Sequence, residues 1–190
     1  MKRTLMMLMV LAVGLLGLMV QSASAAKSTC QMSVTVTTSV GVDVTGDPLA
    51  FGSVAAGVGT AVTGAGASVT NIGTTSQSYR LQVTDKPAQW SVLETAGATG
   101  SEQIKLLALF TTTNPPALGD FTDAGAEDIV LLSGTKNAGA SIFAINTEGA
   151  AAQGLNCTAT SVRKLWFKFF APASTTLTGA QLLTVTVTAY

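Results

Sequence analysis

The sequence predicts an all-β protein, a single antiparallel β-sandwich built from short strands. Near both ends of the chain, over 32–44 and 182–190, apolar residues alternate with Thr, Ser and other small or polar residues. A period of two places the apolar side chains on one face of a strand and the polar ones on the other. Gly, Pro and Asn interrupt the chain at short intervals, and no long pattern with a helical period occurs between them.

The predicted strands share β-branched or aromatic residues and end at turn-forming residues. They cover residues 32–44, 49–54, 68–73, 79–84, 89–94, 103–111, 129–132, 141–145, 163–170 and 181–189. In 79–84 we expect Tyr79, Leu81 and Val83 to face the core. In 163–170 we expect the same of Leu165, Phe167 and Phe169. Residues 57–66 are expected to form a flexible connection of small residues.

The segment 103–111 differs from the others because both of its faces are largely apolar. Ile104, Leu106, Ala108 and Phe110 alternate with Lys105, Leu107 and Leu109. This pattern favours a central strand covered by protein on both sides. A short helix that begins at Ser101 remains an alternative.

The first 25 residues have the features of a secretory signal peptide. Lys2 and Arg3 precede an uncharged apolar run from Leu5 to Val20, and Ala23 and Ala25 occupy the small-residue positions before a cleavage site. We therefore expect an exported protein, secreted or held at the cell surface. Its mature form, residues 26–190, is one β-sandwich domain that does not span the membrane.

Composition excludes several classes of function. Removal of Lys2 and Arg3 leaves eight basic and ten acidic residues, so the mature chain lacks the basic patches that nucleic acid binding requires. The chain contains no histidine, the commonest general base, and no local motif suggests another catalytic group. We expect no enzymatic activity. Charged residues make up only 11% of the chain, and such a surface opposes self-association weakly.

The two cysteines, Cys30 and Cys157, are expected to form one disulfide because an exported chain meets an oxidising environment. Two free thiols are the alternative. The disulfide would close a loop of more than a hundred residues, for which chain entropy gives roughly 4–5 kcal/mol of stabilisation.

Two groups of residues are candidates for binding. The acidic set Asp120, Asp123, Glu127 and Asp128 could supply oxygen ligands to calcium, although an ordinary solvated loop is the simpler interpretation. No other cofactor is expected. Trp166 and Phe170 alternate with the predicted core residues of their strand and would form an interaction surface, unless a loop or another subunit covers them. Tyr190 falls in step with the threonines of the last strand and is expected to face outward.

Three segments resemble exported bacterial β-sandwich proteins. Residues 47–57 contain Leu49-Ala50-Phe51-Gly52-Ser53-Val54, which is similar to an L-x-F-G-x-V segment of immunoglobulin-like and pilin-like domains. Residues 69–73, with Asn71 and Gly73, resemble their V-x-N-x-G turn, and the last strand resembles that of spore-coat-type or fimbrial-type subunits. The resemblance implies an immunoglobulin-like fold and a structural role at the cell surface, and it implies no catalytic residues.

Together these observations favour a structural subunit that associates with copies of itself or with cell-envelope components. The strands over 32–44 and 182–190 are the first candidates for the contact, since an unpaired strand edge can pair with another chain. The alternative is a carbohydrate-binding or adhesive module in which Trp166 or Trp90 stacks on a glycan.

Overall fold

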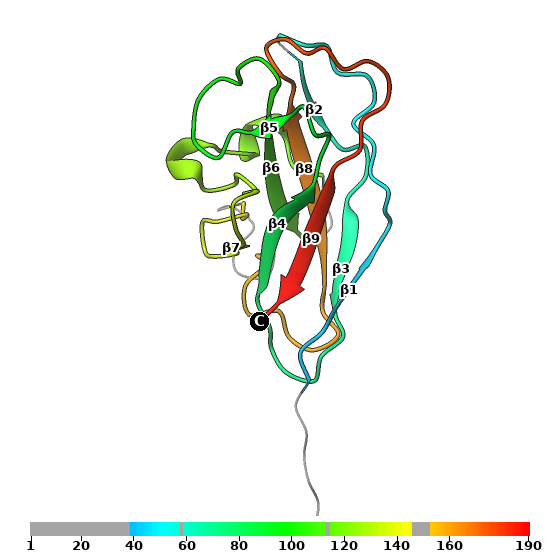
Figure 1. The fold of residues 1–190 in the computed structure, drawn as a ribbon. Helices are drawn as coiled ribbons and strands as arrows, with labels where there is room; N and C mark the ends of the chain where they lie inside the picture. Colours follow the sequence, from blue (N-terminus) through cyan, green and yellow to red (C-terminus); the bar gives the residue numbers. More distant parts are fainter. Residues whose placement is uncertain (1–38, 58, 113–114, 146–152) are drawn as a thin grey trace, which may run out of the picture. The chain divides into compact units, whose positions relative to one another are not determined.

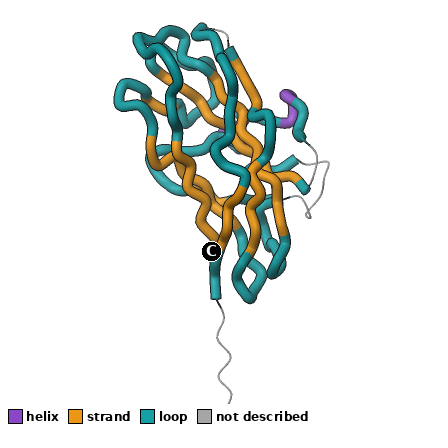
Figure 2. Tube along the Cα trace, turned by 90° about the vertical axis from the view of Figure 1, so that its right-hand side faces the viewer, coloured by secondary structure: helices purple, strands orange, loops and turns teal. Residues whose placement is uncertain are grey.

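The computed structural model describes residues 39–57, 59–112, 115–145 and 153–190. The chain divides into two compact units, residues 1–36 and 37–190, and every described residue belongs to the second. The predicted signal peptide, Cys30 and the first part of the predicted strand 32–44 lie outside the described residues. Within these residues the regular structure is β-strand, with two short 3₁₀ turns and no α-helix, which confirms an all-β fold (Figure 2).

The strands form two sheets (Figure 1). The larger sheet has the order β1 (Val42–Thr45), β3 (Ala67–Asn71), β8 (Val162–Phe170), β6 (Gln103–Thr111) and β5 (Ser91–Val92), and β2 (Thr60–Val62) also pairs with β8. The smaller sheet has the order β7 (Lys136–Asn137), β4 (Tyr79–Asp85) and β9 (Thr184–Ala189). In Figure 1, β4 and β9 lie in front of β6 and β8.

Strand pairing is antiparallel with one exception among the named strands, so the prediction of a purely antiparallel sandwich is wrong at that point. β5 runs parallel to β6, and Ser91 and Val92 are paired with Gln103 and Ile104. The connection 93–102 carries the chain back to the start of β5, so β6 begins in the same direction. A crossover of this kind is what parallel neighbours require.

β2 and β3 behave as one interrupted strand, because both run antiparallel to β8 in the same direction. The interruption, residues 63–66, lies within the segment that was expected to be a flexible connection. Gly66 approaches the indole ring of Trp166 so closely that a Cβ atom at position 66 would lie 2.6 Å from Cε2. Only glycine fits here, and the segment is therefore a packed part of the sheet.

Three predicted strands do not form. Residues 49–54 run as an irregular segment in which Gly52 has a φ of +71°, a conformation outside the β region. Residues 129–132 and 141–145 each contribute only a single bridge to β6, through Ile129 and Ala144 respectively. Two strands were not predicted. β2 lies within the segment 57–66 that was expected to be a flexible connection, and the two polar residues of β7 carry no strand pattern.

The main core lies between the two sheets. From β4 it receives Tyr79, Leu81 and Val83, which are fully buried, as their alternation predicts. β8 contributes Leu165, Phe167 and Phe169, and β6 contributes Ile104, Leu106, Ala108 and Phe110. These ten side chains form the apolar layer that joins the sheets.

A second, smaller core lies on the other face of β6 and β8. It contains Leu107 and Leu109 of β6, Trp166 of β8, and Phe121, Ile129 and Ile145 from the segment 115–145. We name residues 115–145 the covering segment; it includes the turns η1 (Leu118–Asp120) and η2 (Ala124–Ala126). β6 is consequently buried on both faces, which confirms the central strand and excludes the helix alternative.

A buried polar cluster explains the Asn and Gly of the segment 69–73. The Asn71 amide nitrogen donates to the carbonyl oxygens of Thr75 and Cys157, both at 2.8 Å. Its oxygen accepts from the Gly73 N–H at 2.8 Å and from Gln77 Nε2. A Cβ atom on Gly73 would collide with the Gln77 amide. Asn71 and Gly73 therefore stabilise this turn. Asn71 pairs the polar groups of the turn, and buried polar groups need such partners.

Candidate functional site

The two flanks of the pair of sheets differ in how they are closed. On one flank the covering segment hydrogen-bonds to both sheets: Val130 N–H donates to Leu106 O at 2.9 Å, and Val83 N–H donates to Leu131 O at 2.8 Å. On the other flank the edge strands are β1 and β9; among the described residues, β1 pairs only with β3 and β9 pairs only with β4. β1 and β9 approach each other there without pairing.

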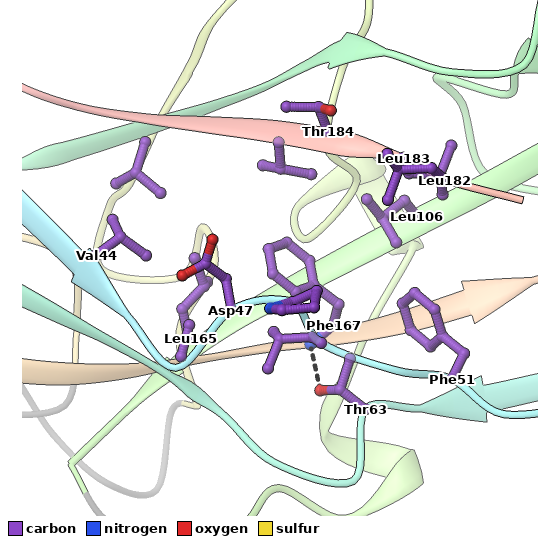
Figure 3. Close-up of a pocket in the computed structure, with 15 residues that line it drawn as sticks. Val44, Asp47, Phe51, Thr63, Leu106, Leu165, Phe167, Leu182, Leu183 and Thr184 are labelled. Atoms are coloured by element: carbon purple, nitrogen blue, oxygen red, sulfur yellow. Dashed lines mark hydrogen bonds between the residues drawn. The ribbon is translucent and has the colours of Figure 1, made fainter.

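An apolar groove of about 350 Å³ lies between these two edge strands (Figure 3). Core residues of the larger sheet, Leu106, Leu165 and Phe167, form part of its lining. The irregular segment after β1, the residues leading into β9 and β9 itself supply most of the remainder: Asp47, Pro48, Leu49, Phe51, Leu182, Leu183, Thr184, Val185 and Val187. Asp47 is the single charged residue of this lining, so the groove favours apolar groups.

The groove is open because the segment 49–54 does not form a strand. Phe51 packs on Phe169, with ring centroids 5.4 Å apart, so the segment is tied to the core at that residue. Within the described residues, the backbone of Ala50 has one backbone hydrogen bond, and it is long. The Gly64 N–H donates to the Ala50 carbonyl oxygen at 3.5 Å. The segment thus covers the core without completing a sheet, and both strand edges beside it remain open.

Within the part of the chain that the structure describes, the backbone groups along one side of β9 have no partner strand. Ser78 and Tyr190 exchange both of their backbone hydrogen bonds, at 3.0 and 2.9 Å, at the end of the β4–β9 ladder. Hydrogen bonding alternates along an antiparallel strand. The N–H and C=O groups of Ala189 and Val187 therefore point away from β4, toward the open flank.

Exposed side chains accompany this edge. Leu182 is 73% exposed and Tyr190 is 46% exposed, as expected for a residue in step with the threonines. The Arg80 guanidinium lies 6.0 Å from the centre of the Tyr190 ring. Leu182 and Tyr190 thus lie beside the two ends of β9. Among the described residues, β9 has the longest free edge.

Trp166 does not lie on the surface as an interaction residue. It is 7% exposed because the covering segment and the interruption between β2 and β3 enclose it, and its Nε1 donates to Thr111 Oγ1 at 3.1 Å. Trp90 is 8% exposed and donates to Thr175 Oγ1 at 3.2 Å. Neither indole offers a free face for stacking. Phe170 is half-buried beside two lysines.

The acidic residues of the covering segment are each engaged elsewhere, apart from Glu127. Asp120 accepts a hydrogen bond from Ala117 N–H at 2.6 Å, and Asp123 forms an ion pair with Lys105. Asp128 is buried and accepts from the N–H groups of Thr122 and Phe143, at 2.7 and 3.1 Å. In the described part of the chain, no three acidic, cysteine or histidine side chains gather in a way that could hold a metal ion.

Cys157 is fully buried beside Gln77, with which it exchanges backbone hydrogen bonds of 2.9 and 2.6 Å. Burial raises the pKa of its thiol, which keeps the thiol protonated. Cys30 lies outside the described residues, so the predicted disulfide stays a prediction.

Lys105 of β6 is a buried charged residue that the sequence pattern did not identify as part of a site. Its side chain is 2% exposed although it carries a charge. A lysine in an otherwise apolar strand was the available signal, since a charge placed on a buried face needs a partner.

Comparison of the chain with protein-family models, with curated proteins and with solved structures gives no match. Among the residues that the structure describes, no helix has the length and apolar character needed to cross a membrane.

Proposed function

We propose that this protein is an exported bacterial structural protein, secreted or at the cell surface, which associates through the open flank of an immunoglobulin-like β-sandwich. Residues 1–25 direct its export as a cleaved signal peptide, and the protein has no enzymatic activity. Its partners are copies of itself or components of the cell envelope.

The observation that carries this proposal is the pair of free strand edges, β1 and β9, on either side of an apolar groove. An unpaired edge offers N–H and C=O groups to another strand, and an adjacent apolar groove accepts its side chains. Among the described residues, the opposite flank offers no comparable edge, because the covering segment is hydrogen-bonded across it.

The surface around the open flank supports association between copies. β9 exposes Thr184 and Thr186 and carries no charged residue over 181–190, so no charge on this strand opposes a second chain. Natural edge strands that avoid pairing usually carry lysine, proline or a bulge. β9 has none of the first two within its length.

Carbohydrate binding by tryptophan stacking is the weaker candidate. Trp90 and Trp166 are both buried, and each indole N–H is already donated to a threonine.

The proposal is tested by the oligomeric state of the purified protein. Light scattering after size exclusion, together with negative-stain microscopy, should show that the wild-type chain forms dimers or larger multimers. Thr186→Lys places a charge on the exposed face of the β9 edge, and we expect it to shift the population to monomer. The Thr186 side chain makes one exposed contact, 2.9 Å from Thr84 Oγ1, so the fold should tolerate the change.

Thr178→Lys is the matched control, because Thr178 is also exposed but lies outside the strands. This variant should assemble as the wild type does. A monomeric wild type would contradict self-association, as would multimers that Thr186→Lys leaves intact.

A further inference from the structure

A second cavity, also of about 350 Å³, lies on the outer face of β6 and β8, away from the groove. Leu107, Phe170 and the two lysines Lys105 and Lys168 come from these strands. The walls include the loop 97–99 and, from the covering segment, Phe121 and Asp123. The cavity therefore combines aromatic rings with three charged groups.

The charge of Lys105 is fully satisfied by the protein. Its ammonium donates to the carbonyl oxygen of Gly97 at 2.6 Å and forms an ion pair with Asp123. It also lies 4.4 Å from the centre of the Phe170 ring, a cation–π distance. Asp123 accepts a further bond from Gly97 N–H at 3.3 Å. The hydrogen bond from Lys105 holds the pKa of Asp123 below its usual value, which favours the carboxylate form of Asp123.

Lys168 has no such partner. Its ammonium donates to Leu118 O at 2.8 Å and lies 5.0 Å from the Phe170 centroid and 5.9 Å from that of Phe121. Within the described residues Lys168 has no ion pair, because the one salt bridge found there joins Lys105 to Asp123. Burial lowers the pKa of Lys168, and the nearby Lys105 ammonium adds to this effect while Asp123 opposes it.

The cavity thus contains one positive charge more than its own carboxylate can balance. An ammonium can donate three hydrogen bonds, and the structure gives Lys168 one acceptor. In the wall beside it, the backbone N–H groups of Ala98 and Thr99 donate to no acceptor within the described residues. Each of these groups is a donor suited to an anion.

We propose that this cavity binds a small organic carboxylate. The anionic group pairs with Lys168, and the body of the molecule packs against Phe121, Phe170 and Leu107. A single negative charge matches the single excess positive charge. The volume lies at the small end of the range of ligand pockets, roughly 300–1,000 Å³, which suits one ring or one sugar. This inference does not depend on the proposed self-association.

The test uses the purified full chain and two carboxylates with different bodies. Benzoate represents a free aromatic acid, and galacturonate represents an acidic sugar of an envelope polysaccharide. Benzamide and galactose are their neutral counterparts. Titrations followed by calorimetry and by NMR should show binding of at least one acid in preference to its neutral partner, with shifts at residues 97–99 and Phe170. Which acid binds identifies the source of the ligand.

Lys168→Met removes the charge and retains the apolar stem. We expect it to weaken binding about tenfold or more, since a hydrogen bond to a charged group is lost. Lys164→Met is the control, because Lys164 is on the same strand but bonds to Ser68 Oγ at 2.7 Å, outside the cavity. Its binding should equal that of the wild type.

Three results would overturn the proposal. They are no binding of either acid, equal binding of the acids and their neutral counterparts, and binding that Lys168→Met leaves unchanged. If Lys168→Met does not fold, the comparison of acid with neutral ligand in the wild-type chain still decides the question.

Discussion

Asp128 shows how a single buried carboxyl can join separate parts of the chain. It accepts hydrogen bonds from the backbone of Thr122 and of Phe143, so it links two parts of the covering segment that lie about twenty residues apart. Despite these bonds, burial raises the pKa of Asp128 to about 7, with a small further increase from Glu127 and an opposing effect from Lys136. The fold therefore favours the protonated form of this acid.

This residue predicts a dependence of stability on pH. In the unfolded chain Asp128 titrates near pH 4, about the usual value for aspartate. Between that pH and about 7 the folded state binds more protons than the unfolded state, so the free energy of unfolding should fall as pH rises. Denaturant unfolding at a series of pH values measures this slope. Asp128→Asn should reduce it, and an unchanged slope in that variant would contradict the assignment.

At the scale of elements, the pattern of apolar residues predicted which side chains of three strands are buried. The inward residues of β4 and β8, and the two buried faces of β6, were read correctly because each depends on neighbours two positions apart. The segment 49–54 was misread because its residues suit a strand while Gly52 takes a positive φ. The burial of Trp166 depends on Gly66 and on the covering segment, which lie far away in the sequence.

The open groove could not be predicted from the sequence, for a related reason. Its walls come from five separate parts of the chain, represented by Val44, Thr63, Leu106, Leu165 and Val185. No periodic pattern connects these residues, since each belongs to a different segment. The candidate edge strands themselves could be named from sequence, because β-branched alternation continues to the last residues.

The covering segment should be part of the cooperative fold although it has little regular structure. Ile129 is fully buried and bridges Leu107, so Ile129→Ala should lower the free energy of unfolding by about 2–5 kcal/mol. Leu118 belongs to the same segment but is 56% exposed. Leu118→Ala should change the stability by less than about 0.5 kcal/mol. Equal effects of the two substitutions, measured by denaturant unfolding, would show that the segment is not packed.

For the whole molecule, we predict that the oxidised protein contains a disulfide between Cys30 and Cys157. Neither cysteine should react with an alkylating agent after unfolding without reductant, as judged by mass spectrometry. Reduction should lower the free energy of unfolding by roughly 4–5 kcal/mol, the chain-entropy value for a loop of more than a hundred residues.

Cys30→Ser provides the control for this experiment. Its Cys157 should react only once the protein is unfolded, because Cys157 is buried. Alkylation of both cysteines in the unreduced wild-type protein would exclude the disulfide.

The position of both long edges on one flank restricts the symmetry of any assembly that they build. When two copies meet through the same flank, each uses its own β1 and β9, and a twofold axis closes the contact. The edge strands on the covered flank, β5 and β7, have two residues each. They are too short to bind a further subunit by edge pairing. Edge pairing alone should therefore give closed dimers, and a fibre would require a second, different surface on each subunit.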